Sequence, residues 1–264
     1  MSAGVHDGRI GGSGRSGSEI DLSVVVPVRD EAPNLEPLYE RVCGALDGFA
    51  RWELLIVDDG SRDGSCDVIR ALAEKDARVR GASLARPCGQ SSAIFVGVDL
   101  ARGALIATLD GDLQNDPADL RALVEGLPGY DAVVGYRVRR QDGLLKRVSS
   151  RIANAVRDAV SGDRVTDTGC SLKVFRADAL RSVPRFEGMH RFLPTLLRYQ
   201  SFRVAELPVS HHPRTAGRSK YGIRNRMVRA FIDLLAVRWM RSRMARPPVR
   251  AWIGRCEACD ESDA

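Results

Sequence analysis

Residues 104–117, with the sequence ALIATLDGDLQNDP, join an apolar run directly to a cluster of carboxylates. The run from Ala104 to Leu109 is typical of a buried strand, and Asp110 and Asp112 follow at once. Side chains alternate along an extended chain, so these two carboxylates point the same way. Like charges held together destabilise each other unless a cation lies between them. Since magnesium and manganese prefer oxygen ligands, the stretch predicts a divalent-metal site at the end of a strand.

Strand-like and helix-like segments alternate on both sides of this stretch. Apolar strand patterns begin near residues 22, 52, 79, 104 and 131, and helical periodicity covers 34–47, 65–75, 90–102 and 117–126. This alternation predicts an α/β fold with a mostly parallel central sheet and helices on both faces. Ligands bind beyond the carboxyl ends of the strands in such sheets. We therefore expect the loops 27–31, 58–61 and 110–114 to share one rim and form a site.

The second half of the chain has a different pattern. Residues 143–160 read as an amphipathic helix, TDTGCSLKVFR (166–176) as a loop entering a strand, 189–200 as a helix, and FRVAELPV (202–209) as a strand. Residues 1–19 are rich in Gly and Ser and are expected to be disordered. The predicted organisation is thus a tail (1–19), a catalytic domain (20–222), a basic amphipathic helix (223–247) and a second tail (248–264).

The positive charge of the chain is concentrated in one segment. The whole chain has a net charge of +6 and a pI of about 9.2, and residues 223–246 alone contain seven Arg and one Asp. The six cysteines are scattered and follow no secretory signal, so we expect reduced thiols in a cytosolic setting. Cys256 and Cys259 have no second Cys or His pair nearby, which argues against zinc. No apolar run reaches the length of a membrane span, so no transmembrane segment is expected.

The basic segment 223–246 has two compatible interpretations. Its apolar residues recur at spacings of three and four with Arg on the flanks; they are Ile223, Met227, Phe231, Leu234, Leu235 and Trp239. A basic amphipathic helix can lie in the interface of an anionic leaflet, where each Arg near the surface contributes on the order of 1 kcal/mol. The same apolar stripe can instead pack on the catalytic domain or on a second copy of the chain, giving a homo-oligomer.

Five motifs, in this order, give the chain its family resemblance: VVVPVRDEAPNL (24–35), ELLIVDDGSRDGS (53–65), GQSSAIFVGVDLARGALIATLDGDLQNDP (89–117), TDTGCSLKVFR (166–176) and GRSKYG (217–222). Together they resemble the family 2 inverting glycosyltransferases, which have the Rossmann-like GT-A fold. The resemblance covers roughly residues 21–222. It is closest to the polyprenyl-phosphate branch, which includes dolichyl-phosphate mannosyltransferases and bacterial undecaprenyl-phosphate sugar transferases.

The resemblance implies a binding site for a nucleotide-sugar donor and a divalent metal. The donor residues that it implies are Pro27, Arg29, Glu31, Val57, Asp58, Asp59, Asp110 and Gly111. Asp58 and Asp59 would accept hydrogen bonds from the base and ribose. Asp110, Asp112 and Gln114 would hold Mg²⁺ or Mn²⁺, which offsets the charge developing on the departing diphosphate.

The implied acceptor is a polyprenyl phosphate, which needs cations rather than a general base, because its phosphate is already an anion near neutral pH. Arg137, Arg147, Arg218 and Lys220 are the predicted acceptor-phosphate residues, and Asp112, Asp167, Arg137, Arg218 and Lys220 the predicted catalytic residues. Asp167 either lies beside the donor sugar or caps its own loop. His190, His211 and His212 have no carboxylate cluster next to them in the sequence, and we interpret them as ordinary polar positions.

The leading hypothesis is therefore an enzyme that moves a sugar from a nucleotide sugar to a polyprenyl phosphate, acting in the cytoplasm at the inner face of the membrane. A second hypothesis keeps the fold and donor but replaces the acceptor with a soluble molecule, a glycan or a protein, which would require a general base. A third is a non-enzymatic basic module that binds membrane or nucleic acid. Rim carboxylates would repel phosphate without a cation, so no nucleic-acid partner is expected.

Overall fold

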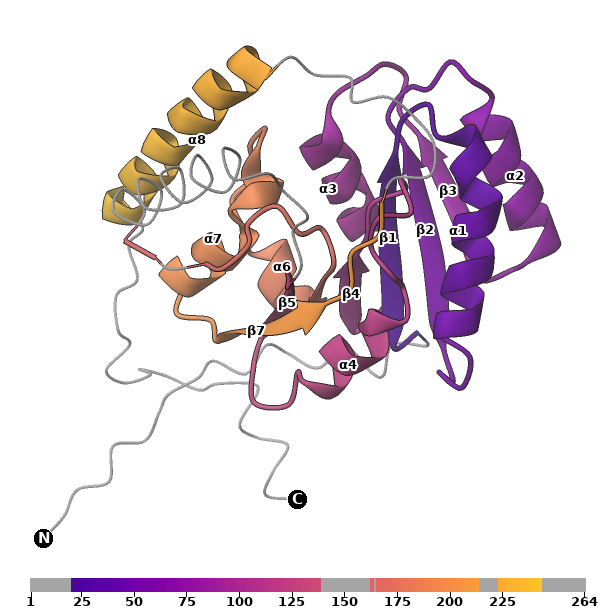
Figure 1. Ribbon diagram of the computed structural model, residues 1–264, viewed down its shortest axis with the longest axis horizontal. Helices are drawn as coiled ribbons and strands as arrows, with labels where there is room; N and C mark the ends of the chain where they lie inside the picture. The colour runs from indigo at the N-terminus through magenta and orange to yellow at the C-terminus, as the bar shows by residue number, and fades with distance from the viewer. Residues whose placement is uncertain (1–19, 139–161, 164, 214–222, 244–264) are drawn as a thin grey trace, which may run out of the picture.

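The computed structural model describes residues 20–138, 162–163, 165–213 and 223–243, with side chains in the last helix described from residue 232 onward. Within them a seven-stranded sheet has the order β3-β2-β1-β4-β6-β5-β7 (Figure 1). Its strands are β1 (Leu22–Val28), β2 (Trp52–Asp58), β3 (Val79–Ser83), β4 (Leu105–Thr108), β5 (Ala132–Arg137), β6 (Lys173–Arg176) and β7 (Val204–Val209). Only the pairings of β6 are antiparallel. The prediction of a mostly parallel sheet is confirmed.

Helices cover both faces of the sheet. They are α1 (Ala32–Ala45), α2 (Ser65–Lys75), α3 (Gln90–Leu100), α4 (Asp119–Glu125), α6 (Ala177–Arg181), α7 (Leu193–Tyr199) and α8 (Ile223–Arg243), with a 3₁₀ turn η1 (Met189–Arg191). Residues of α1, α2 and α4 belong to one buried cluster, and residues of α3, α6, η1, α7 and α8 to the other. The sheet therefore separates two hydrophobic cores.

The two cores follow from the period of the strands. In β1, Val24 and Val26 face the core under α1, whereas Val25 faces the core under α3. A strand covered on both faces has no polar side, which explains the apolar run Val24–Val28 of β1. Pro27 is tolerated because the pairing of β1 with β4 ends at Val25, so no ladder hydrogen bond to β4 is lost there.

Two predicted elements differ in the structure. Residues 189–200 form η1 and then α7 rather than one helix, since Pro194 lies in the first turn of α7 and favours a new helix start there. The short helix α6 was not predicted, because five residues give little periodic signal. The predicted helix 143–160, the GRSKYG motif (217–222) and both predicted tails lie outside the described residues.

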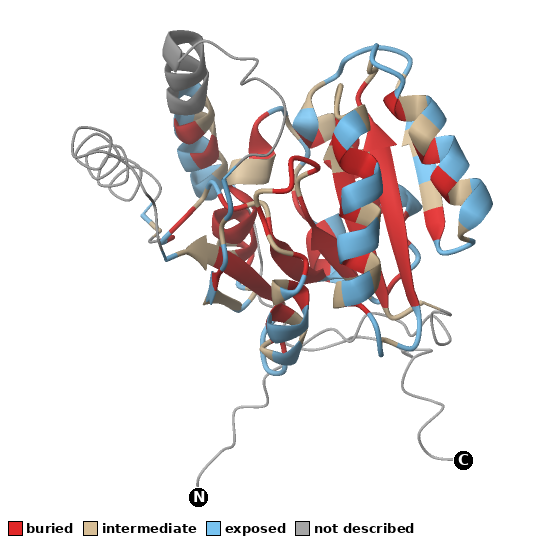
Figure 2. Cartoon of the chain, turned by 45° about the vertical axis from the view of Figure 1, so that its right-hand side comes forward, coloured by how far each residue is buried: buried red, intermediate tan, exposed pale blue. Residues whose placement is uncertain are grey.

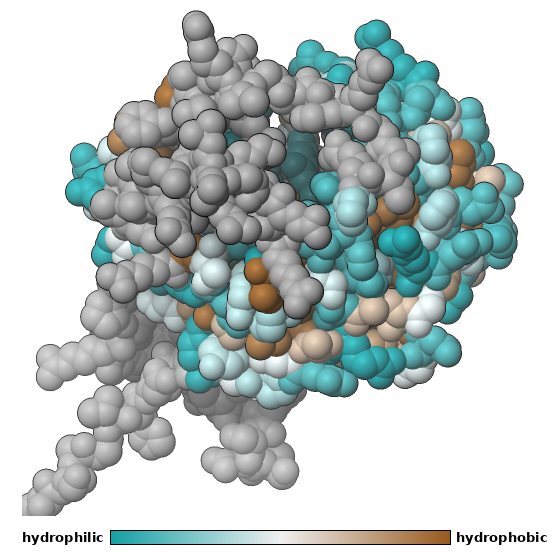
Figure 3. Space-filling model, viewed as in Figure 1, coloured by the Kyte–Doolittle hydropathy of each residue, from teal (hydrophilic) through white to brown (hydrophobic). Residues whose placement is uncertain are grey.

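Helix α8 packs against the α3-side core through only part of its surface. Leu234 and Val237 are buried, whereas Ile232, Leu235 and Trp239 are 58%, 47% and 61% exposed. Buried and exposed residues alternate along the described turns of this helix (Figure 2). By contrast, hydrophilic residues cover most of the surface over α1 and α2, at the right in Figure 3. No helix in the described ranges is both long and apolar enough to cross a bilayer.

Candidate active site

The rim at the carboxyl ends of β1 and β2 consists of two interlocked loops. The backbone N–H of Asp30 donates to Ser61 Oγ at 2.8 Å, and the N–H of Arg62 donates to Asp30 Oδ1 at 2.8 Å. The N–H of Glu31 donates to Ser65 Oγ at 3.1 Å. Asp30 has a φ of 50°, so this turn is held in a left-handed conformation by its partners. The β1–α1 loop, which carries Arg29 and Glu31, is therefore fixed to the β2–α2 loop, whereas Pro27, expected in this loop, lies within β1.

Asp58 and Asp59 are almost fully buried and already engaged within the protein. Asp58 accepts hydrogen bonds from both the N–H and the hydroxyl of Ser61 and, at 2.9 Å, from Ser83 Oγ. Asp59 accepts the N–H groups of Cys88 at 2.6 Å and Gly89 at 2.9 Å. Both carboxylates thus anchor rim loops. A carboxylate offers about four acceptor positions. Asp59 keeps some of them for a ligand, whereas the hydrogen bonds from Ser61 and Ser83 occupy those of Asp58. The contact of either residue with the donor stays a prediction. Val57 precedes them and is buried.

The acidic loop leaves β4 beside this rim. Asp110 accepts a hydrogen bond from Gln90 Nε2 at 2.8 Å, and Asp112, which is 9% exposed, accepts the N–H of Gln114 at 3.2 Å. Leu113, between Asp112 and Gln114, has a φ of 61° and a buried side chain. A left-handed leucine costs about 1 kcal/mol or more and persists only where its surroundings enforce it, as at a binding loop.

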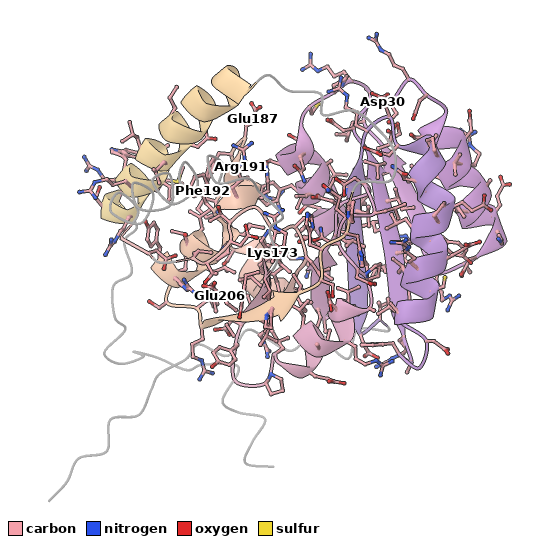
Figure 4. The ribbon with its side chains drawn as sticks, viewed as in Figure 1. Asp30, Lys173, Glu187, Arg191, Phe192 and Glu206 are labelled. Atoms are coloured by element: carbon pink, nitrogen blue, oxygen red, sulfur yellow. The ribbon has the colours of Figure 1, made fainter. Side chains whose placement is uncertain are left out.

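Charges of both signs surround the acidic loop. Burial and the neighbouring Asp112 charge raise the pKa of Asp110, while Ser171, Lys173 and Arg137 oppose this shift. Lys173 is 4% exposed and donates to the carbonyl of Cys170. Burial lowers the pKa of Lys173, whereas Cys170, Asp110 and Asp167 act to raise it. Figure 4 shows this lysine near the centre of the molecule. Lys173 therefore lies among the carboxylates and the arginine of this rim.

Arg137 and Asp167 form a bidentate ion pair at the end of β5. Arg137 Nε donates to Asp167 Oδ2 at 2.6 Å and Nη2 donates to Oδ1 at 3.0 Å, with side chains 17% and 6% exposed. Burial disfavours the guanidinium, but Asp167 raises the pKa of Arg137 above its ordinary value. Asp167 also accepts the N–H of Gly169 at 3.0 Å. Asp167 therefore both caps its loop and orients Arg137.

A strap of three residues after β7 holds the outer part of the acidic loop. Ser210 N–H donates to Asp119 Oδ2 at 2.6 Å, His211 forms a β-bridge with Asn115, and His212 N–H donates to the carbonyl of Gln114 at 2.8 Å. His212 Nε2 lies 3.2 Å from Asp116 Oδ2.

His211 was interpreted from the sequence as an ordinary polar position, and that interpretation stays a prediction. Burial and Arg137 lower its pKa, while Asp112 and Asp167 act to raise it, so it lies within the charged cluster.

The residues present fit a divalent cation that also contacts substrate. In the described part of the chain, no group of three His, Cys, Asp or Glu residues is arranged to hold a metal by itself. Asp110 and Asp112 lie near enough to each other that Asp112, after burial, contributes to the raised pKa of Asp110, and Gln114 supplies a neutral oxygen two residues further on. Two carboxylates and an amide leave coordination positions open, as Mg²⁺ and Mn²⁺ require when they bind phosphates.

Comparison with known proteins identifies the family. The sequence model described as glycosyl transferase family 2 matches residues 23–183. This chain belongs to glycosyl transferase family 2.

Two relatives of this glycosyltransferase show which branch it resembles. The dodecaprenyl-phosphate galacturonate synthase of Rhizobium johnstonii is 42% identical over 235 residues, covering 86% of this chain and 69% of the relative. The undecaprenyl-phosphate 4-deoxy-4-formamido-L-arabinose transferase of Shewanella sediminis is 38% identical over 217 residues, covering 81% and 65%. The chain thus spans about two thirds of the length of the curated relatives that it matches.

Solved structures confirm the GT-A-like fold of this glycosyltransferase. Glucosyl-3-phosphoglycerate synthase from Mycobacterium tuberculosis, in complex with Mn²⁺, UDP and phosphoglyceric acid, superposes with a TM-score of 0.63 at 20% identity, covering 86% of this chain and 80% of that one. A mannosyltransferase from Pyrobaculum calidifontis, in complex with GDP-Man and Mn²⁺, gives a TM-score of 0.62 at 20% identity, covering 89% and 70%. At this identity the likeness concerns the fold alone.

Several residues of the site were not among the predicted site residues. Lys173, Asn115, His211 and Gln90 all contact or face the predicted cluster; Asn115 Nδ2 donates to Ser171 Oγ at 2.6 Å. The DxDxQ pattern gives Asp110, Asp112 and Gln114, and Asn115 follows it directly, but only tertiary pairing brings Gln90, Lys173 and His211 to them. Arg147, Arg218 and Lys220 lie outside the described residues.

Proposed function

We propose that this glycosyltransferase transfers one sugar from a nucleoside-diphosphate sugar to a polyprenyl phosphate, with inversion at the anomeric carbon. The observation that supports this most strongly is the placement of the Asp110–Gln114 loop beside the Arg137–Asp167 pair at one rim of the sheet. The acidic loop suits a metal-bound diphosphate, and the arginine suits a second anion. The names of the relatives agree with this acceptor class.

Each side of the site would hold one anionic reactant. Asp110, Asp112 and Gln114 would ligate Mg²⁺ or Mn²⁺, which when bound neutralises charge developing on the leaving diphosphate. Arg137 would hold the acceptor phosphate so that its oxygen approaches the anomeric carbon from the face opposite the leaving group. The lipid phosphate needs no general base, because it is already deprotonated near neutral pH. Pro27, Arg29, Glu31, Val57, Asp58 and Asp59 would line the nucleoside side of the rim.

A hydroxyl acceptor on a soluble molecule, glycan or protein is less compatible with this geometry. It would require a general base to remove its proton. Asp167, the carboxylate expected beside the donor sugar, is already engaged, because both of its oxygens accept from Arg137. The ion pair favours an acceptor that is already charged.

We also propose that α8 lies against the membrane that carries the acceptor. Leu234 and Val237 attach the helix to the domain, and Ile232, Leu235 and Trp239 form an outward apolar face. Arg238 and Arg243 are exposed on the same helix, which suits an anionic leaflet. A lipid acceptor would then reach the site from the inner, cytoplasmic membrane surface. A second copy of the chain is the alternative occupant of this face.

The enzymatic proposal is tested by supplying labelled UDP- and GDP-sugars with undecaprenyl phosphate in detergent and Mn²⁺. We expect label in a solvent-extractable lipid, lost on addition of EDTA and reduced about a hundredfold or more in Asp112→Asn. Gly44→Ala, on an open surface of α1, is the control and should retain activity. Release of free sugar, or transfer only to soluble acceptors, would contradict the proposed acceptor.

A further inference from the structure

The first turn of α3 connects the rim loops to each other. Asp59, the residue after β2, accepts the N–H groups of Cys88 and Gly89, which lead into this helix. Gln90, its first residue, donates from Nε2 to Asp110 Oδ1 at 2.8 Å. A displacement of this turn would therefore move the partners of both carboxylates at once.

The next residue of this turn, Ser91, is bound to the segment around η1. Ser91 is 3% exposed, and its Oγ lies 2.7 Å from His190 Nδ1. The same oxygen accepts the N–H of Gly188 at 3.0 Å. A hydroxyl can accept one hydrogen bond while it donates or accepts another. Ser91 thus links the α3 turn to two residues that are close in sequence to each other and far from it.

The η1 segment is in turn held from its other side by α8. Gly188 has a φ of 90°, and a Cβ at this position would overlap the carboxylate of Asp233 on α8. Arg191 Nη1 lies 3.9 Å from Asp233 Oδ2. Figure 4 shows Glu187 and Arg191 on the segment between α8 and the rest of the domain. With α8 on one side and Ser91 on the other, the segment serves as a fixed support.

We infer that His190 and Ser91 are positioning residues for the donor half of the active site. They lock the first turn of α3 against η1, so that Gln90 holds Asp110 and the Cys88–Gly89 backbone holds Asp59. This inference rests on the proposed function, because it assigns the rim carboxylates to the nucleotide donor. Its consequence is that His190 affects donor binding without contacting the donor.

A matched control exists at the opposite end of the sheet. Ser23 is fully buried, donates to Glu53 Oε1 at 2.7 Å and accepts the N–H of Gly103 at 2.8 Å. Its surroundings repeat those of Ser91, with one side-chain partner and one glycine N–H, but they lie at the start of β1 rather than at the rim. Ser23→Ala therefore measures the loss of stability that the same substitution causes away from the site.

The experiment compares four variants with the wild type: Ser91→Ala, His190→Ala, His190→Asn and Ser23→Ala. For each, calorimetry measures the affinity for UDP and GDP with Mn²⁺. Thermal unfolding gives the melting temperature, and steady-state kinetics give the KM of donor and acceptor. Ser91→Ala and His190→Ala should weaken nucleotide binding and raise the donor KM by about five- to tenfold, the size of one lost hydrogen bond, with the acceptor KM unchanged. His190→Asn can still hydrogen-bond Ser91 and should recover much of the affinity. Ser23→Ala should lower the melting temperature and leave nucleotide affinity unchanged.

Two results would overturn this account, and they are distinguishable. If the wild-type chain binds neither nucleotide, the proposed function itself fails. If the wild type binds a nucleotide and His190→Ala binds it equally well, only the positioning role fails. Should Ser91→Ala not fold, the pair of His190 variants decides, since His190 is partly exposed and its replacement leaves no fully buried cavity.

Discussion

At the scale of single residues, Gly111 sets how closely the acidic loop approaches β1. A Cβ at this position would lie 2.7 Å from Val28 Cγ1, which is too close for any side chain. Gly111→Ala should therefore displace Asp110 and Asp112 and lower kcat/KM by about a hundredfold, as small misplacements of reacting groups do. Steady-state kinetics with saturating Mn²⁺ would measure this. Gly44→Ala, which meets no atom within 4 Å, should show wild-type kinetics; equal activity in both variants would contradict the tight packing of the loop.

The Arg137–Asp167 pair gives a second prediction at this scale. Asp167→Ala leaves a mostly buried guanidinium without its bidentate partner, so we expect a loss of about 3 kcal/mol in the free energy of unfolding and a large loss of turnover. Urea unfolding and acceptor kinetics would measure the two effects. Asp99→Ala breaks another two-bond Arg–Asp pair, with Arg185, in which both side chains are about half exposed, and should cost under about 1 kcal/mol. Similar losses in the free energy of unfolding for Asp167→Ala and Asp99→Ala would contradict the claim that burial makes the Arg137–Asp167 pair more costly to break.

The residues that sequence could identify are those whose signal is local. The clustering of Asp110 and Asp112 was predictable because both directly follow an apolar run, although they lie in the turn after β4 rather than in a strand, and their metal-binding role stays a prediction. Lys173 and His211 were not predictable, because β6 enters the sheet antiparallel between β4 and β5, and the strap after β7 returns to the acidic loop. The spacing of residues in the sequence does not indicate that either segment packs beside the acidic loop.

At the scale of elements, α8 makes different use of its two faces. Leu235→Ser with Trp239→Ser removes outward apolar surface, and should weaken binding to vesicles containing anionic lipid while leaving the melting temperature unchanged. Val237→Ser, on the buried side of the same helix, should lower the melting temperature, because a buried side chain loses apolar contacts and gains an unpaired hydroxyl. Vesicle co-sedimentation and thermal unfolding would compare them. If the outward double variant instead dissociates a dimer and binds vesicles normally, a second copy is the occupant.

The elements themselves were largely predictable, because strands covered on both faces read as apolar runs and the helices between them as 3.6-residue periods. The exceptions are short or interrupted. Five residues of α6 contain little more than one turn, and Pro194 restarts the helix within the predicted segment 189–200. Boundaries of this kind are set by a single proline or fall in a segment too short to show a period.

At the scale of the whole molecule, the free energy of unfolding should depend on pH through the ionisation of Asp76. Hydrogen bonds from Arg78, above all, lower the pKa of Asp76 to about 2, and its side chain is 11% exposed. A lowered folded-state pKa stabilises the fold above the unfolded value near 4, and that contribution is lost as the pH falls toward 2. It amounts to about 1 kcal/mol after allowance for the half-exposed Arg78.

Asp76→Asn should therefore be less stable than wild type at pH 7, and the difference should shrink between pH 4 and pH 3. Urea unfolding at several pH values would measure it. The control is Asp67→Asn, which breaks the exposed pair with Arg70 and should change the free energy of unfolding by less than about 0.5 kcal/mol. A difference between Asp76→Asn and wild type that is independent of pH would contradict the charge-based explanation.

The placement of the diphosphate and its metal at the acidic loop can be tested most directly by anomalous diffraction from crystals grown with Mn²⁺ and UDP or GDP. We predict a manganese peak at about 2 Å from an Asp112 carboxylate oxygen, the usual distance for a hard divalent cation, with the diphosphate bound to the same ion. A nucleotide bound at another part of the surface, with no manganese at Asp112, would contradict the assignment of this rim as the catalytic centre.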